Sequence, residues 1–333
     1  MLGAIIGDII GSRFEWNNNK SKEFELFTSD CFFTDDSIMT IGVAKAILES
    51  KDDYFDLDEQ TIKWLRIIGR PYPNSGYGAN FYNWLYSDNP TPYNSFGNGA
   101  SMRVSAVSYA SKSLEDAEYL AYLVSSITHN HEEGIKGAKA VASAIYLAKL
   151  GFHKSYIKQY IEDNYYDLDF TIDSIRDSYQ FNETCQETVP QALEAFFESK
   201  SFVDAIRIAI SLGGDSDTIA AITGSVAEAY YGISSKLRKV ALSYLDERLK
   251  SIVLEFEKAF PFKVIKKKHK GYKKLKCPYC GSPYAVPYIY GDVGEVEYIF
   301  ENQFHECIAR GETTFSKEDG YCYNCDHRFY LNK

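Results

Sequence analysis

The chain has 333 residues and carries 36 lysines and arginines against 46 aspartates and glutamates, a formal net charge of −10. Hydrophobic residues at 45% and charged residues at 25% are typical of a globular protein, which excludes the disordered, collagen-like and coiled-coil classes for most of the chain. No apolar run approaches the roughly 18 residues that span a membrane, and the apolar start contains Asp8 and lacks a basic leader. We therefore expect a soluble cytoplasmic protein with no membrane partner.

Charge is divided unevenly along the chain. Residues 1–262 contain 24 basic and 37 acidic groups, whereas residues 263–333 contain 12 and 9. The split predicts two domains, residues 1–262 and 277–333, joined by a basic linker at 263–276 that has eight lysines and no acid. Five of the seven cysteines lie after the linker, a distribution that does not fit a secreted disulfide framework.

In the first domain, apolar residues recur at spacings of three and four, and no alternating pattern of comparable length competes with them. The domain is therefore predicted to be all-α, a compact multi-helix fold. Helices are predicted at residues 38–48, 136–150, 189–198, 203–212, 219–231 and 237–259.

The first residues of the chain contain a glycine stripe. Gly3, Gly7 and Gly11 fall four residues apart, on one face of a helix. Close packing of a second helix against this face accounts for the stripe without any function. Glu15 follows the stripe and, taken alone, has the pattern of a surface acid.

Two short acidic segments each precede a predicted helix: Phe-Thr-Asp-Asp-Ser at residues 33–37 and Gly-Gly-Asp-Ser-Asp-Thr at residues 213–218. Aspartate, serine and threonine are favoured helix N-caps, which explains either segment alone. Adjacent carboxylates repel each other unless a cation neutralises them, and Mg²⁺ prefers oxygen ligands. If the segments face each other, they predict a site for one or two divalent ions.

Two other segments are candidate ligand contacts. Glycines in the loop at residues 95–103 would present N–H groups to a phosphate, with Arg103 supplying charge, although a Gly-Asn-Gly turn is structurally ordinary. His129 and His131 are two residues apart and so point to different sides of a helix. We expect His129 to contact a ligand and His131 to lie at the surface.

Five segments, in this order, resemble the ADP-ribosylglycohydrolase family, which includes dinitrogenase reductase-activating glycohydrolase-like proteins: GAIIGDIIGSRFE, FTDDSIMT, GNGASMR, THNHEEGIKGAKAVASAI and SLGGDSDTIAAITGSVAEAYYG. The resemblance covers about residues 1–260. It implies an all-α fold with a binuclear magnesium or manganese centre that hydrolyses the N- or O-glycosidic bond between ADP-ribose and an acceptor. By motif match, the metal ligands would be Thr34, Asp35, Asp36, Asp215, Asp217 and Thr218.

The same resemblance implies the remaining roles. Glu15 matches an acidic residue on a mobile flap, and the catalytic carboxylates would be Glu15, Asp36 and Asp215. The residues expected to contact the ADP-ribosyl group are Asn98, Gly99, Arg103 and His129.

This chain departs from the family pattern at two places. Ser37 replaces a second threonine and keeps the hydroxyl group. No carboxylate occurs at residues 94–97, where some members place a catalytic aspartate. Acid–base work would therefore fall on Glu15 or on water held by the metals.

After the linker, short runs of aromatic and β-branched residues predict strands at residues 284–290, 298–304 and 327–331. Two C-x-x-C pairs separated by 41 residues predict one structural Zn²⁺ in a closed tetrahedral site. We expect His305 and Cys307 not to be ligands, because the two pairs already fill four positions. The tail resembles a zinc ribbon, and its expected ligands are Cys277, Cys280, Cys322 and Cys325.

Three functions are consistent with these patterns. The first is a metal-dependent hydrolase that releases ADP-ribose from an ADP-ribosylated protein or other acceptor. The second is a protein that binds ADP-ribose or a related nucleotide without cleaving it. The third is an adaptor that binds nucleic acid through the basic linker and tail. A protein partner fits the tail equally, and lysines that only keep the linker solvated also explain its charge.

Overall fold

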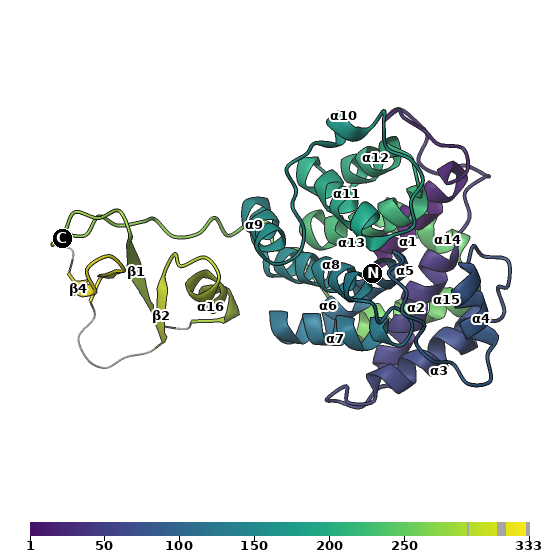
Figure 1. Cartoon of the computed structure of the whole chain (residues 1–333), viewed down its shortest axis with the longest axis horizontal. Helices are drawn as coiled ribbons and strands as arrows, with labels where there is room; N and C mark the ends of the chain where they lie inside the picture. The colour runs from purple at the N-terminus through teal and green to yellow at the C-terminus, as the bar shows by residue number, and fades with distance from the viewer. Residues whose placement is uncertain (292, 312–317, 331–333) are drawn as a thin grey trace. The chain divides into compact units, whose positions relative to one another are not determined.

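The computed structural model describes residues 1–291, 293–311 and 318–330, and it divides into two compact units, Met1–Lys267 and Lys268–Lys333 (Figure 1). The first unit is helical, and the second contains a small sheet and one helix, so the predicted fold class is confirmed. Among the described residues, none of the helices combines the length and the apolar character needed to cross a bilayer.

The helices of the first unit are α1 (Leu2–Gly11), α2 (Asp35–Glu49), α3 (Leu57–Gly69), α4 (Ala79–Tyr86), α5 (Gly99–Met102), α6 (Val107–Ala110), α7 (Leu114–Ser126), α8 (Glu132–Leu150), α9 (Lys154–Asn164), α10 (Ile172–Ile175), α11 (Cys185–Glu198), α12 (Phe202–Leu212), α13 (Ser216–Tyr231), α14 (Ser235–Tyr244) and α15 (Glu247–Ala259), with short 3₁₀ helices η1 (Ser12–Phe14) and η2 (Val104–Ala106).

Every predicted helical segment is helical, with one interruption. The segment predicted as a single helix at residues 237–259 is two helices, because α14 ends at Tyr244 and α15 begins after Asp246. The Asp246 carboxylate accepts a hydrogen bond from the backbone N–H of Leu249 at 3.0 Å and so caps the new helix. Apolar spacing continues across the break, which is why periodicity alone did not show it.

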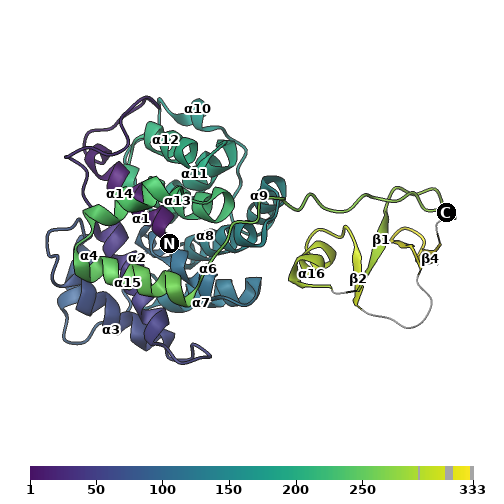
Figure 2. The same ribbon diagram turned by 180° about the vertical axis from the view of Figure 1, so that it is seen from behind.

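Helix α13 lies at the centre of the helical unit. It is buried along almost all of its length and packs against α1, α8, α11 and α12 (Figure 1). On the side seen in Figure 2, α14 lies against α1 and α15 lies against α2. A central helix with no exposed face must be apolar or small all round, which agrees with the alanines and isoleucines of α13.

The glycine stripe of α1 is the surface that meets α13. A β-carbon built on Gly7 would overlap the backbone carbonyl of Ala220, and one built on Gly3 would overlap that of Gly224. The predicted close helix packing is therefore confirmed. Backbone-to-backbone contact also sets the end of α1 beside the start of α13, since a β-carbon on Gly11 would meet the backbone of Asp217.

The second unit contains β1 (Ala285–Tyr290), α16 (Glu295–Asn302), β2 (Ile308–Gly311), β3 (Gly320–Cys322) and β4 (His327–Phe329). The strand order is β2-β1-β3-β4. Strand β1 is parallel to β2 and antiparallel to β3, and β3 is antiparallel to β4.

Of the three strands predicted in the tail, one is wrong. Residues 298–302 belong to helix α16, whose start is capped when the backbone N–H of Gly294 donates to the carboxylate of Glu297 at 2.9 Å. Ile299 and Phe300 are adjacent and both buried. In a strand with one buried face, buried and exposed side chains would alternate, so this pattern is more typical of a helix. The predictions at 284–290 and 327–331 correspond to β1 and β4, and residue 331 lies outside the described residues.

Replacement of Gly7 by alanine should strongly destabilise the helical unit, because its methyl group would have to displace the backbone of α13. Overpacking of this kind costs about 1–3 kcal/mol or more. Gly78→Ala is the matched control, since a β-carbon built on Gly78 would meet no atom within 4 Å. Thermal unfolding of both variants measures the difference, and equal melting temperatures would contradict the packing described.

Candidate functional site

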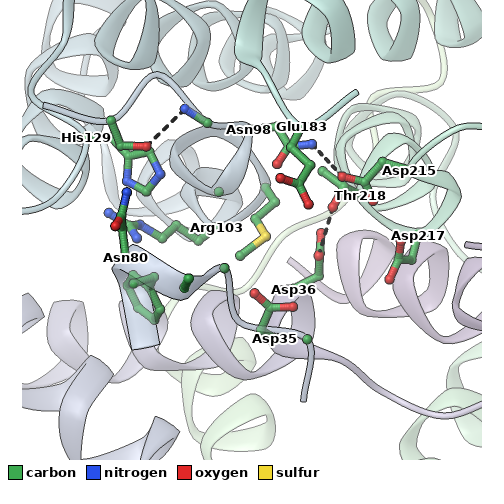
Figure 3. Close-up of a pocket in the computed structure, with 18 of the residues that line it drawn as sticks. Asp35, Asp36, Asn80, Asn98, Arg103, His129, Glu183, Asp215, Asp217 and Thr218 are labelled. Atoms are coloured by element: carbon green, nitrogen blue, oxygen red, sulfur yellow. Dashed lines mark hydrogen bonds between the residues drawn. The ribbon is translucent and has the colours of Figure 1, made fainter. Parts of the chain in front are cut away.

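A cavity of about 270 Å³ opens in the helical unit where the starts of α2 and α13 meet. Residues from seven separate stretches of the chain line it, including the loop before α5, the residues before α8 and the loop before α11 (Figure 3). The sequence-predicted site residues on its wall are Glu15, Asp35, Asp36, Asn98, Gly99, Arg103, His129, Asp215, Asp217 and Thr218.

The two acidic segments face each other across this cavity. The hydroxyl of Thr218, in the first turn of α13, donates a hydrogen bond to Asp36 Oδ2 at 3.0 Å (Figure 3). Asn98, which precedes α5, donates through Nδ2 to Asp215 Oδ2 at 2.7 Å. These bonds join three segments that lie more than 60 residues apart in the sequence.

Part of this acidic cluster has no partner within the chain. Asp36 Oδ1 and Asp217 Oδ1 are buried side-chain oxygens that accept no hydrogen bond from the described residues. Glu15, Asp215 and Asp217 each place a carboxylate oxygen within 4.8 Å of the other two. Buried, unpaired and mutually close carboxylate oxygens fit a hard divalent cation such as Mg²⁺ or Mn²⁺.

The pKa values of the cluster also indicate a cation-binding site. Burial, followed by repulsion from neighbouring carboxylates, holds the pKa values of Asp35, Asp36 and Asp217 well above their usual range. Burial, with Asp215 as the next cause, raises the pKa of Glu15 to about 7. Without a cation the cluster therefore favours its protonated form, and a bound divalent ion would reverse that preference.

Asp8 is a site residue that the sequence analysis missed. From inside α1 its carboxylate accepts hydrogen bonds from the backbone N–H groups of Thr34 and Ser37, both at 3.0 Å, and from both of their hydroxyls. Burial raises the pKa of Asp8 to about 6. In the sequence, the feature that could have indicated this role is that Asp8 is the only acidic residue in the otherwise apolar segment at residues 2–11.

The hydroxyl groups of Thr34 and Ser37 are bonded to Asp8 and do not point into the cavity. Thr34 does not line the cavity: its hydroxyl donates to Asp8 at 2.7 Å and accepts from the N–H of Asp36 at 3.3 Å as the N-cap of α2. Ser37 keeps the hydroxyl that a threonine would have, and this hydroxyl donates to Asp8. Asp8 thus fixes the first turn of α2, from which Asp35 and Asp36 project.

His129 lines the cavity and is supported from behind by a buried arginine. Arg103 Nη2 donates to the hydroxyl of Thr128 at 2.7 Å, and this oxygen lies 2.7 Å from His129 Nδ1. Burial, with the charge of Arg103 as a second cause, holds the pKa of His129 well below its usual value. The imidazole is therefore neutral, and its Nε2 faces the Gly97–Gly99 turn.

The structure places Arg103 and His131 in supporting positions. Arg103 is 1% exposed and its Nη2 also donates to the carbonyl of Val124 at 3.0 Å, whereas its buried Nε has no hydrogen-bond partner among the described residues. His131 is half-buried as the N-cap of α8, where Nδ1 accepts from the N–H of Glu133 at 3.1 Å.

The tail has a second cluster of ligand atoms. One sulfur atom from each of Cys277, Cys280, Cys322 and Cys325 lies within 4.8 Å of the others, and two of the Sγ–Sγ distances are 3.7 Å. That separation is far too long for a disulfide and matches the edge of a tetrahedron with Zn–S bonds of about 2.3 Å. The described arrangement therefore fits a structural Zn²⁺, with Cys307 outside the cluster.

Comparison with known proteins identifies the family. A family model for ADP-ribosylglycohydrolase matches residues 1–261. The chain belongs to the ADP-ribosylglycohydrolase family.

Curated relatives agree with this assignment. ADP-ribosylhydrolase ARH3 of Mus musculus is 24% identical over 309 residues, covering 70% of this chain and 83% of that protein. ADP-ribosylarginine hydrolase Tri1 of Pseudomonas putida is 26% identical over 281 residues, covering 75% of each. A solved structure named as an ADP-ribosylglycohydrolase-related protein complex has the same fold, with a TM-score of 0.55 at 20% identity over 77% of this chain and 95% of that one.

Within this family fold, the structure adds cavity residues that sequence reasoning did not select. Glu183, from the loop before α11, lines the cavity near Asn98 and Asp215 (Figure 3). Phe81 and Tyr93 also line it, with the Phe81 ring 5.8 Å from the Arg103 guanidinium carbon and the Tyr93 ring 5.9 Å from that of His129. A glutamate or tyrosine in a loop has no local sequence pattern to distinguish it. Only the pairing of distant segments brings these side chains to the site.

Removal of divalent cations should make this family member less stable as the pH rises. The folded-state pKa values of Asp8 and Glu15, about 6 and about 7, exceed those of unfolded carboxylates, so the folded state binds extra protons. The free energy of unfolding should therefore decline from about pH 4 to about pH 7 in EDTA. Mg²⁺ that binds the folded state should oppose this decline.

Thermal melts across this range, with EDTA or with Mg²⁺, measure the effect. We expect the two melting curves to converge at low pH and to differ by several degrees at high pH. Asp215→Asn should abolish the difference, and an equal Mg²⁺ shift in that variant would place the cation elsewhere.

Proposed function

We propose that this chain hydrolyses the glycosidic bond between ADP-ribose and a modified acceptor, with a protein side chain as that acceptor. The observation that carries the proposal is the pair of buried carboxylate oxygens, Asp36 Oδ1 and Asp217 Oδ1, left without partners on the wall of the cavity. Family membership and relatives named as ADP-ribosylhydrolases support it.

The proposed cofactors are two Mg²⁺ or Mn²⁺ ions. When bound, such ions orient substrate hydroxyl groups and lower the pKa of coordinated water. The donor set is rich in carboxylate and hydroxyl oxygens, which suits hard cations. The residues proposed to hold the ions are the cavity-lining Asp35, Asp36, Asp215, Asp217 and Thr218. Thr34, predicted as a ligand, instead caps α2 with its hydroxyl bonded to Asp8.

The other cavity residues have distinct proposed tasks. Neutral His129 and the turn at Asn98 and Gly99 bind the ADP-ribosyl group, and Arg103 keeps His129 in place through Thr128. Cleavage at C1″ develops positive charge on the ribose, which the carboxylates of Asp36 and Asp215 stabilise. Glu15 stands beside Asp215 and accepts a proton from the attacking water.

Released ADP-ribose from an ADP-ribosylated protein, measured with Mg²⁺ and with EDTA, tests this function. We expect turnover only with the metal, and at least about a 100-fold loss of kcat in Glu15→Gln because the proton acceptor is removed. Asp215→Ala should lose both turnover and the Mg²⁺ dependence.

A binding measurement separates the hydrolase from a non-catalytic reader. Glu15→Gln should still bind ADP-ribose, which isothermal titration checks, while its turnover is lost. Binding without any turnover in the unmodified chain would favour the reader, and metal-independent release would contradict the proposed centre.

For the tail, we propose a structural Zn²⁺ on its four clustered cysteines and a surface that binds single-stranded nucleic acid. A groove beside this site is lined by Lys274, Tyr284, His305 and Tyr323, among others, and the Tyr284 side chain is 65% exposed. Exposed aromatic rings stack on unpaired bases, and lysines attract phosphates. The eight lysines of residues 263–276 extend the positive charge next to the groove in sequence.

Fluorescence anisotropy of the full chain with a labelled oligouridine measures this binding. Tyr284→Ala should weaken it by about 1–3 kcal/mol, and binding should weaken further as salt is raised. Tyr119→Ala, an exposed tyrosine of α7, is the matched control. Zinc analysis should show one ion per chain in all three proteins, and equal binding by the two variants would favour a protein partner instead.

A further inference from the structure

The loop before α11 lies directly against the loop before α5. The backbone N–H of Asn98 donates to the carbonyl of Glu183 at 2.7 Å, and the N–H of Cys185 donates to the carbonyl of Phe96 at 2.9 Å. An isolated antiparallel bridge also joins these two segments. Residues 94–97 lack a carboxylate in sequence, and this pairing sets the backbone of Glu183 beside that segment in space.

The Glu183 side chain is directed to the cavity rather than away from it. It lines the same cavity as Asp36 and Asp215, and Figure 3 shows it close to Asn98 on the side of Asp215. Within the described part of the chain, its carboxylate has no hydrogen-bond or ion-pair partner. Both of its oxygens are therefore available to a bound substrate.

Glu15 and Glu183 occupy different parts of the cavity. Glu15 shares the cation-binding cluster with Asp215 and Asp217, whereas Glu183 is not part of that cluster. The rings of Trp16, the residue after Glu15, and Phe181, two residues before Glu183, stack with their centroids 5.0 Å apart. The stack joins the segment that carries Glu15 to the segment that carries Glu183.

The surroundings of Glu183 also favour a carboxyl group that carries a proton. Partial burial, followed by the charge of Asp215, raises the pKa of Glu183 above its usual value. The charge of Asp215 disfavours the ionised form of Glu183, and the charge of Glu183 in turn helps to raise the pKa of Glu15.

Glycosidic hydrolysis uses two carboxyl groups with different tasks, one that donates a proton to the leaving group and one that acts on the water or the ribose. We propose that Glu183 is the general acid of this reaction and so replaces the carboxylate that residues 94–97 lack. This inference rests on the proposed hydrolase function.

The proton transfers balance. As the bond from C1″ to the acceptor breaks, its electron pair goes to the acceptor nitrogen or oxygen, which takes the proton of the Glu183 carboxyl group. The oxygen of the attacking water bonds to C1″, and its proton goes to Glu15. The products are ADP-ribose and the free acceptor, and exchange of one proton with solvent restores both glutamates.

Dependence on the leaving group tests this role, because a good leaving group departs without a proton. The two substrates are an ADP-ribosylated peptide and an ADP-ribose that carries 4-nitrophenol at C1″. We expect Glu183→Gln to lower kcat at least about 100-fold on the peptide and only about threefold or less on the nitrophenyl substrate. Glu15→Gln should lower kcat on both substrates, since both need the attacking water.

Glu187→Gln is the matched control, an exposed glutamate in the first turn of α11 that does not line the cavity. It should behave as the unmodified chain. Equal losses on both substrates in Glu183→Gln would assign Glu183 to binding or packing and overturn the inference, as would full activity on the peptide. If the unmodified chain releases no ADP-ribose from either substrate, the proposed function itself fails.

Discussion

The contact of helix α1 with helix α13 through their backbones is the constraint on which the site depends. It requires glycine at Gly3, Gly7 and Gly11, because any side chain would meet the main chain of α13. This contact fixes both ends of the acidic cluster at once. Gly11 sets Glu15 beside the start of α13, and Asp8, on the same helix, holds the start of α2 through the backbone and hydroxyl groups of Thr34.

The acidic cluster is costly for the folded chain by itself. Several carboxylates are buried with few donors to satisfy them, and their mutual repulsion adds to the cost of burial. Such a site is stable either protonated or bound to cations. Strain of this kind at one place, in a domain whose remaining core is apolar and closely packed, is typical of a functional site. The carboxylates of this cluster account for part of the net negative charge of the chain, and they lie in the cavity.

The two units differ in the interactions that stabilise them. The helical unit has a large apolar core around α13, whereas the buried clusters described in the tail are small, one of Cys277, Ala285, Cys322 and Phe329 and one of Val286, Tyr288 and Ile308. A core this small needs a further constraint, and the four cysteines fit a metal that would supply it. The helical unit carries the proposed chemistry, and the tail carries the surface proposed to bind a partner.

The sequence by itself determined the helical class, the glycine face of α1 and the two acidic segments, because each depends on local spacing or on the chemistry of adjacent residues. Periodicity misassigned residues 298–304 and did not show the break before α15, since short apolar runs fit more than one element. Only the tertiary structure revealed Asp8 and Glu183 as site residues. Their positions follow from pairings between distant segments, the first with the start of α2 and the second with the loop before α5, and no local pattern encodes such pairings.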